Sequence, residues 1–353
     1  MAVAQGPGPE IPSQLDAWID SVSLVSIGED DVDPLYLVVG AVFHGDTLII
    51  AENSTGMLRY YDRATGRLHR TVGGTGEGPG EYQALVFLQV VGDRIHTFDL
   101  VASRVTIMDL AGVVERTVRI APTSRHMAPQ VLGFFPDGAM LVAGFSRDWT
   151  NVARVPTIRR DPWVLSRHDE MGNFIDSLGW YLGKEFYVVP YGRDGEAMPE
   201  WPVPFARLSM VGVFGDNYYV ADNMEPRIPL FDQEGNLRDE LDVEISPEPQ
   251  RVTREDARRF READEVDRQP PEFYPFLGEA RNVSGRLWVR HYGSGESDVH
   301  TWTVLSSDGD IVGRVRSLDR LVVLAVDGDT AAVVRVDDLG VETVELRRIL
   351  EWR

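Results

Sequence analysis

The chain has 353 residues, with 35 Lys and Arg against 56 Asp and Glu, and so a formal net charge of −21. This acidity excludes a sequence-independent nucleic-acid binder, which needs cations to neutralise phosphates, and it disfavours docking on an anionic membrane. The sequence contains no Cys, which excludes a disulfide framework and a Cys-ligated metal. No run of residues approaches the roughly 20 apolar positions of a membrane-spanning helix, so we expect no direct membrane insertion.

Residues 1–14 are expected to form a tail outside the folded domain, which would span residues 15–353. Ala2, Val3 and Ala4 followed by Gln5 match the small-x-small end of a secretory signal peptide. Two interpretations remain open: the remnant of a processed signal, or a chance match in an Ala-rich start.

Six short apolar strands each follow a tight turn, and three of the five gaps between them are close to the 40–50 residues of a propeller repeat. The residue before each strand is Asp or Gly: Asp46, Asp93, Gly138, Asp216, Gly285 and Asp329. Asp and Gly suit tight hairpins through side-chain capping and positive φ. Each repeat then continues through further strands, which predicts four-stranded antiparallel units.

The last repeat supplies only three clear strands, whereas Trp18–Ile27 has strand character and no partner of its own. We expect this N-terminal strand to become the outer strand of the last unit and to close the ring, because closure protects sheet edges. The sequence therefore predicts an all-β fold: a six-bladed β-propeller with one short helical insertion.

Two segments resemble a known family. The loop from Gly73 to Tyr82 (GGTGEGPGEY) resembles the GxGxGPGE-aromatic signature of bacterial exported six-bladed β-propellers, which are similar to NHL-repeat proteins. The strand Gly285–Arg290 (GRLWVR) is similar to a strand of the same family. The resemblance covers most of the chain and implies the fold and an extracytoplasmic location, whereas fold alone does not fix function.

The long connections are all expected on one face of the ring, at residues 146–162, 182–207 and 245–278. One-sided loops on a rigid ring are typical of a binding face. Residues 253–268 are expected to form a charged helix with Thr253 as N-cap. The candidate partner-binding residues share this face and are acidic or aromatic: Glu77, Glu81, Tyr82, Trp149, Tyr187, Tyr191, Trp201 and Phe260. The alternative is that the aromatic side chains pack the loops onto the blades.

Polar residues recur where the second strand of a repeat ends, and carboxylate and amide oxygens suit Ca²⁺. The candidate ligands are Glu52, Asn53, Asp99, Asp222, Asn223 and His291. A structural role in capping the adjacent loops is the other interpretation. The Gly73–Tyr82 loop is not expected to bind phosphate, because strands and not a helix are predicted to follow it.

Two functional hypotheses follow. In the first, the protein is non-catalytic and outside the cytoplasm, needs no cofactor, and binds a protein partner through its loops, as an extrinsic subunit of a respiratory or photosynthetic membrane complex would. In the second, it is a Ca²⁺-dependent hydrolase or lactonase with its site at the loop-side end of the channel. The absence of a linear catalytic motif such as GxSxG or HExxH favours the first hypothesis.

Overall fold

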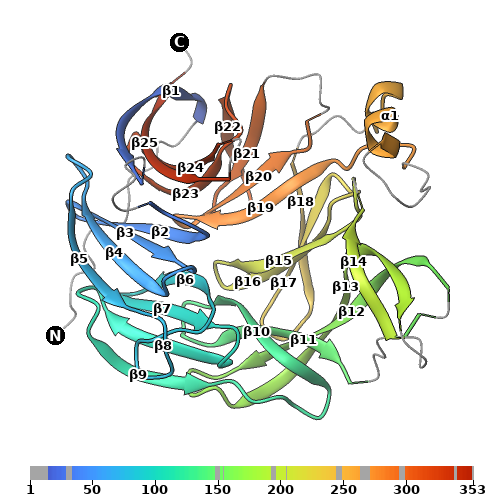
Figure 1. Cartoon of the computed structure of the whole chain (residues 1–353), viewed down its shortest axis with the longest axis horizontal. Helices are drawn as coiled ribbons and strands as arrows, with labels where there is room; N and C mark the ends of the chain where they lie inside the picture. Colours follow the sequence, from blue (N-terminus) through green and yellow to red (C-terminus); the bar gives the residue numbers. More distant parts are fainter. Residues whose placement is uncertain are drawn as a thin grey trace.

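The computed structural model describes residues 15–28, 34–147, 152–153, 155–191, 196–203, 205–243, 249–262, 271–293, 299–337 and 340–351. The fold is a β-propeller: its sheets follow one another around a central axis (Figure 1). Within the described residues, one helix interrupts the strands, α1 (Arg254–Glu262). No helix in that part of the chain is long and apolar enough to cross a membrane.

The first four sheets are consecutive meanders, which we call blades 1 to 4. Blade 1 comprises β2 (Val38–His44), β3 (Thr47–Glu52), β4 (Met57–Asp62) and β5 (Leu68–Gly73). Blade 2 comprises β6 (Leu85–Val91), β7 (Arg94–Asp99), β8 (Arg104–Asp109) and β9 (Val114–Arg119). Blade 3 has five strands, β10 (His126–Phe134), β11 (Met140–Ser146), β12 (Thr157–His168), β13 (Phe174–Tyr191) and β14 (Glu196–Pro202). Blade 4 comprises β15 (Ser209–Phe214), β16 (Asn217–Asp222), β17 (Arg227–Phe231) and β18 (Leu237–Asp242).

The remaining strands form one eight-stranded sheet with two antiparallel halves. One half is β19 (Leu277–Val283), β20 (Arg286–His291), β21 (His300–Leu305) and β22 (Ile311–Ser317). The other is β23 (Val322–Asp327), β24 (Thr330–Val336), β25 (Glu342–Glu351) and β1 (Leu15–Ile27). The halves meet where β1 pairs with β22 in parallel, from Leu15↔Gly313 to Trp18↔Arg316.

The N-terminal strand lies where the sequence analysis expects it. β1 pairs antiparallel with β25, with Trp18 opposite Leu350 and Val25 opposite Leu346, and so forms the outer strand of the C-terminal half. The two ends of the domain therefore share one sheet. The additional pairing with β22 was not predicted.

The predicted Asp–Gly hairpins are present. Asp62 accepts a hydrogen bond from the backbone N of Thr65 at 2.8 Å, and Asp109, Asp169 and Asp232 make equivalent turn contacts. These bonds stabilise the ionised carboxylates, and the bonds from Thr65 lower the pKa of Asp62. Gly66 adopts φ 69°, which favours glycine at the end of that turn.

Apolar side chains fill the space between adjacent sheets. Leu48 and Ile50 of blade 1 are fully buried and share a cluster with Ala332 of β24, so the first and last sheets pack together. This packing continues the ring from the last sheet back to the first.

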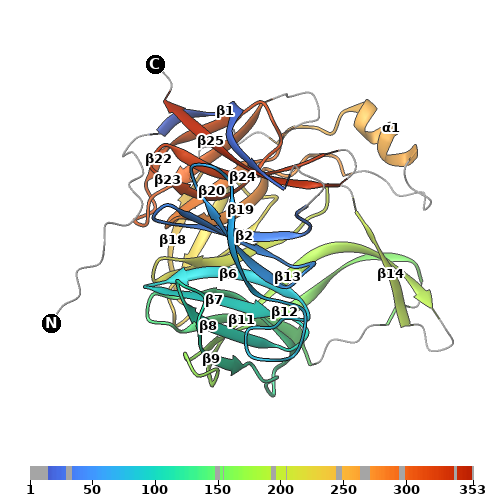
Figure 2. The ribbon, with the colours of Figure 1, turned by 60° about the vertical axis from the view of Figure 1, so that its left-hand side comes forward.

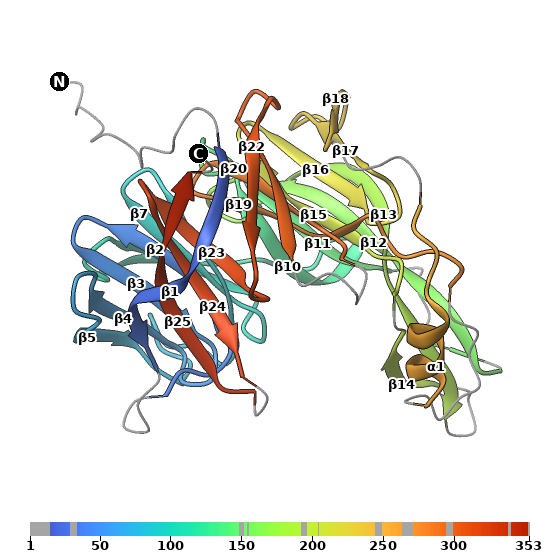
Figure 3. The same cartoon turned by 90° about the horizontal axis from the view of Figure 1, so that it is seen from above.

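One of the expected loops is largely strand, and a second is strand in part. Residues 146–162 include the first part of β12, and residues 182–207 include the end of β13 and all of β14. β-branched and aromatic residues such as Tyr187, Val188 and Val189 favour a pleated sheet, so blade 3 is extended in place of a loop. Figures 2 and 3 show β14 and α1 both projecting beyond the ring on the same side.

Candidate functional site

The projection on blade 3 is a three-stranded extension, which we call the arm: residues 157–160 of β12, 185–191 of β13, and β14. Thr157 pairs with Val188, and Tyr187 pairs with Trp201. Tyr187 is buried against Val203 and Ala206, whereas Val188 packs with Ala153. The arm therefore has apolar packing of its own.

An aromatic cluster lies at the base of the arm. The rings of Phe205 and Tyr274 meet edge to face with centroids 5.1 Å apart, and Tyr292 stacks on Tyr274 at 6.0 Å. These residues come from three different connections between strands. The cluster therefore joins the blade 3 extension, the α1 segment and the end of β20 into one body.

The helix is attached through the same tyrosine. Thr253 caps α1 as predicted, because its Oγ1 accepts a hydrogen bond from the N of Asp256 at 3.0 Å. The hydroxyl of Tyr274 donates to the Asp256 carboxylate and accepts from the N of Thr253 at 3.2 Å. Burial, helped by the bond to the Asp256 carboxylate, raises the pKa of Tyr274. The hydroxyl thus stays protonated at neutral pH and able to donate.

The Gly73–Tyr82 loop is a compact crossing from β5 to β6. Tyr82 is 1% exposed, and its hydroxyl lies 2.7 Å from Thr97 Oγ1 inside the core between blades 1 and 2. Its side chain therefore offers no surface to a partner, so the prediction of Tyr82 as a partner-binding residue is wrong. Strands flank the loop on both sides, in agreement with the expectation that it is not a phosphate loop.

Glu77 and Glu81 lie at the surface of this loop. Glu81 Oε2 accepts a hydrogen bond from the N of Gly78 at 2.8 Å, and Glu77 Oε1 accepts one from Gln83 Nε2 at 3.1 Å. Arg104 donates to the carbonyl oxygens of both residues. Both carboxylates are exposed but tied to the loop that carries them.

Four of the candidate partner-binding residues lie wholly or partly outside the described residues. Trp149 lies outside the described residues. The backbone positions of Tyr191, Trp201 and Phe260 are in β13, β14 and α1, whereas their side chains are not described. Their roles in binding stay predictions.

The predicted metal ligands instead perform a repeated structural task. Asp99 is fully buried and accepts hydrogen bonds from the backbone N of Gln83, Ala84, Val101 and Ala102, at 2.9–3.2 Å. It thereby joins the entry to β6 to the loop after β7. Its oxygens are occupied by backbone donors.

Glu52 is the last residue of β3 in blade 1, and Asn223 directly follows β16 in blade 4. Glu52 accepts from the N of Tyr36 at 3.1 Å and pairs with Arg59 at 2.8 Å. Asn223 accepts from the N of Leu208 at 2.9 Å and donates to the carbonyl of Ala206. The polar residues at these strand ends thus hold the adjacent loops through hydrogen bonds, which is the structural role considered in the sequence analysis.

Asp222 and His291 are engaged through their side chains, and Asn53 through its backbone. Asp222 pairs with Arg207 at 2.7 Å and Arg160 at 3.2 Å. The backbone N of Asn53 donates to the carbonyl of Leu37 at 3.0 Å. His291 Nε2 lies 2.8 Å from Thr303 Oγ1, which itself donates to the carbonyl of Val243, so His291 carries its proton on Nε2. Within the described residues, no three His, Asp or Glu side chains converge as a metal site would require.

Blade 3 also contains a buried chain of polar groups that the sequence did not reveal. His126 Nε2 lies 3.0 Å from Ser166 Oγ, which lies 3.1 Å from His168 Nε2. His168 Nδ1 must donate to the carbonyl of Gly172 at 3.0 Å, so its Nε2 accepts from Ser166 and Ser166 accepts from His126. Burial lowers the pKa of His126 to about 4 and keeps both rings neutral. Only long-range packing brings these residues together.

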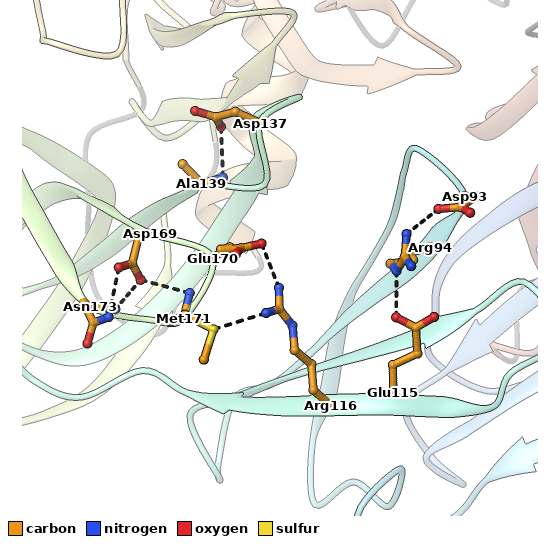
Figure 4. A network of polar contacts seen from close by, with 10 residues as sticks. All are labelled: Asp93, Arg94, Glu115, Arg116, Asp137, Ala139, Asp169, Glu170, Met171 and Asn173. Carbon is orange, nitrogen blue, oxygen red and sulfur yellow. Dashed lines mark hydrogen bonds and ion pairs between the residues drawn. The ribbon is translucent and has the colours of Figure 1, made fainter. Parts of the chain in front are cut away.

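An open cleft of about 560 Å³ lies between blades 2 and 3, on the face of the ring opposite the arm. The turns at Asp93 and Gly138 line it, and we call this face the short-turn side. Figure 4 shows its charged walls: Arg94 bonds to Asp93 and Glu115, and Arg116 bonds to Glu170 and Met171. The carboxylate of Asp137 caps its own turn by accepting from the N of Ala139 at 2.9 Å. The two cations of the cleft are therefore already paired.

No family model matches the sequence, and a search of curated proteins returned no match. Several solved structures are similar to this chain over most of its length. A Bacteroides fragilis protein that is described as an exported protein is 13% identical to this chain. The match covers 92% of this chain and 94% of that chain, with a TM-score of 0.49. A member of the DUF4221 family from Bacteroides vulgatus is 8% identical over 95% and 98%, with a TM-score of 0.48. The calcium-binding protein regucalcin from Agrobacterium tumefaciens is 12% identical over 94% and 98%, with a TM-score of 0.42.

Proposed function

We propose that the protein is a non-catalytic interaction module that acts outside the cytoplasm and binds a protein partner through the arm and the α1 segment. The observation that carries this proposal is the aromatic cluster of Phe205, Tyr274 and Tyr292. It fixes three separate insertions on one side of a rigid ring. A pre-organised projection of this kind reduces the entropy cost of binding.

The chemistry of the strand ends supports binding over hydrolysis. A metal-dependent hydrolase needs ligand oxygens with free lone pairs around one point. The carboxylates of Glu52, Asp99 and Asp222 are directed at neighbouring backbone N–H groups and Arg side chains within their own part of the ring. Ca²⁺ would have to displace these contacts, so we place the hydrolase hypothesis second.

We further infer that the ring has six blades. The eight-stranded sheet is antiparallel throughout except at the short β1–β22 pairing, and each half is a complete four-stranded meander. Counting each half as a blade adds two to the four separate sheets. This count agrees with the resemblance to exported six-bladed, NHL-like propellers.

The proposal is tested by trimming the arm. In one variant, Asn-Gly replaces residues 188–200, so that Tyr187 and Trp201, which are already paired, flank a two-residue turn. In the control, Asp93→Ala changes an exposed residue on the short-turn side. Immobilised wild-type and variant proteins, matched for melting temperature, are exposed to envelope extracts of the native source. A partner retained by the wild type and the control but lost by the trimmed protein is expected, whereas equal capture by all three contradicts the proposal.

A further inference from the structure

The cleft between blades 2 and 3 has an acidic lining. Four carboxylates and two guanidinium groups line it, which gives the lining a net charge of −2. The carboxylates come from three turns and from β9: Asp93, Glu115, Asp137 and Glu170. The volume of about 560 Å³ is within the range of small-molecule sites, about 300–1,000 Å³. Acidic clusters are common on a protein with a net charge of −21, but a second feature of this cleft points to a ligand.

His96 is the one buried residue among those that line the cleft, with an exposed fraction of 6%. Its Nδ1 lies 3.4 Å from the carbonyl oxygen of Arg94, and because a carbonyl only accepts, the ring proton is on Nδ1. Burial lowers the pKa of His96 to about 4, so at neutral pH the ring is uncharged and Nε2 keeps its lone pair. The described residues offer Nε2 no hydrogen-bond donor. An acceptor without a partner on a largely buried ring indicates a donor from outside the chain.

Contacts between the two blades fix the base of the cleft. The side-chain amide of Gln89 on β6 donates to the carbonyl of Phe134 on β10 and accepts from the N of the same residue, both at 3.0 Å. The ring centroids of Phe134 and His96 are 4.6 Å apart. The imidazole is therefore held between the blades, and a ligand meets a preformed acceptor, which reduces the entropy cost of binding.

The walls of the cleft offer further acceptors (Figure 4). Arg94 is bound by Glu115 Oε2, and Arg116 is bound by Glu170 Oε2. The other oxygen of each glutamate, Oε1, makes no hydrogen bond with a described residue. The side chains of Glu115 and Glu170 are 40% and 60% exposed, so these oxygens are open to a ligand. Because the cations are paired and acceptors are free, the cleft suits a ligand that carries donors and positive charge.

These acceptors are spread over the cleft and do not gather at one point. Within the part of the chain that the structure describes, no three His, Asp or Glu side chains converge as the ligands of a metal ion would. An extended organic cation can reach the acceptors one at a time, through N–H donors at its two ends.

We propose that the cleft binds a small organic dication with an ammonium or guanidinium group at each end. One end donates to Nε2 of His96 at the base, and the other donates to the free oxygens of Glu115 and Glu170 on the more exposed walls. Two positive charges balance the −2 of the lining. The cleft lies on the face opposite the arm, so this binding does not depend on the proposed protein partner, and its test can fail while that proposal stands.

Isothermal titration calorimetry of the whole protein at low salt tests the binding. Ligand concentrations up to about 5 mM detect a Kd of about 1 mM or tighter. The probes are putrescine, with two ammonium ends, and agmatine, with one ammonium and one guanidinium end; butanediol is the uncharged analogue. We expect one dication to bind per chain, for at least one of the two probes, and no binding of butanediol. No saturable binding of either dication, or equal binding of butanediol, overturns the proposal.

Removing two glutamate charges locates the site. Glu115→Gln with Glu170→Gln preserves side-chain size and removes the net charge of the lining, so we expect binding to weaken by about ten-fold or more. The matched control is Glu240→Gln with Asp308→Asn, which removes two exposed charges from an outer strand and a turn of other sheets. Melting curves establish that both double variants are folded. Unchanged affinity in the first variant, or an equal loss in both, contradicts the proposal.

Nitrogen NMR of the histidine side chains provides a second readout. A donor at Nε2 of His96 changes the shielding of that nitrogen, so its resonance is expected to move as the dication is added. His96→Gln identifies the resonance, and His69, exposed on β5, is the reference that should not move. Saturation with no change at His96 places the cation elsewhere and overturns the proposal.

A short peptide with two Lys residues among uncharged ones distinguishes a free cation from a protein side chain. The peptide is expected to bind more weakly than the better dication, because one side chain brings only one charge to the base and walls of the cleft. Tighter binding of the peptide would assign the cleft to a protein partner and would overturn the proposal.

Discussion

Tyr274 and Asp256 are joined by a hydrogen bond from the tyrosine hydroxyl to the carboxylate, which attaches α1 to the chain segment that enters β19. The same hydroxyl accepts from the N of Thr253, so one side chain holds the first turn of the helix from two directions. Tyr274 is 3% exposed, and its ring supports Phe205 at the base of the arm. This residue therefore links the orientation of the helix to that of the blade 3 extension.

Removing only the hydroxyl tests this link. Tyr274→Phe keeps the ring contacts and loses both hydrogen bonds, at an expected local cost of about 1–2 kcal/mol. Amide hydrogen exchange in α1 should become several-fold faster while the core strands of the ring are unchanged. Tyr36→Phe, at a 46% exposed tyrosine, is the control. Unchanged exchange in α1 would show that the helix is held by other contacts.

Asp99 is predicted to stabilise the fold through its four backbone hydrogen bonds. Asp99→Ala leaves buried N–H groups without partners and should lower the free energy of unfolding by about 2–4 kcal/mol in urea titrations. Asp99→Asn keeps an acceptor oxygen, as Asn223 does in blade 4, and should cost less. If the two variants unfold like the wild type and differ instead in bound Ca²⁺, the structural role is refuted in favour of a metal site.

Two buried histidines and one half-buried histidine predict a loss of stability in mild acid. Burial lowers the pKa values of His96, His126 and His291 to about 4, below the value of about 6.5 in the unfolded chain. Between these two pKa values the unfolded state binds more protons, so the free energy of unfolding falls as the pH falls from about 6.5 to 4. Each histidine contributes up to about 1.4 kcal/mol per pH unit.

Urea titrations across this pH range measure the effect. His126→Gln removes one titrating group, and its stability should depend less steeply on pH than that of the wild type. A slope in His126→Gln equal to that of the wild type would contradict the proposed neutral state of His126.

Gly144 is predicted to be required because there is no room for a larger side chain at its position in β11. A Cβ at this position would lie 2.6 Å from His126 Nδ1 and 2.7 Å from the carbonyl oxygen of Met127. Gly144→Ala should therefore destabilise the protein by about 1–3 kcal/mol. Gly40→Ala is a matched control, since its nearest neighbour would be Leu88 Cβ at 3.5 Å, an ordinary contact. Equal melting temperatures for the two variants would show that β10 moves to accommodate the methyl group.

The repeat pattern was sufficient to predict the order of strands, because turn residues such as Asp62 and Asp232 act locally. It also predicted the partner of the N-terminal strand, since the last repeat lacked an outer strand. The extension of β13 and β14 was not predicted, because a long connection rich in aromatic residues and Pro does not distinguish a loop from an added hairpin.

The candidate site was predicted less completely for the same reason. The sequence shows that Glu52, Asp99 and Asn223 recur at strand ends, but it does not show which donors face them. The cluster of Phe205, Tyr274 and Tyr292 depends on three connections that are far apart in the chain. The sequence alone does not indicate that these three rings are in contact, because the fold of the ring brings their connections together.

Site-specific photo-crosslinking in the native cell tests the central claim most directly. A photoreactive residue replaces Lys184, which is exposed at the base of the arm, or Asp93 on the short-turn side. The account predicts a discrete adduct with another protein from position 184 and none from position 93. Adducts from position 93 alone, or no adduct with another protein from position 184, would contradict a binding role for the arm.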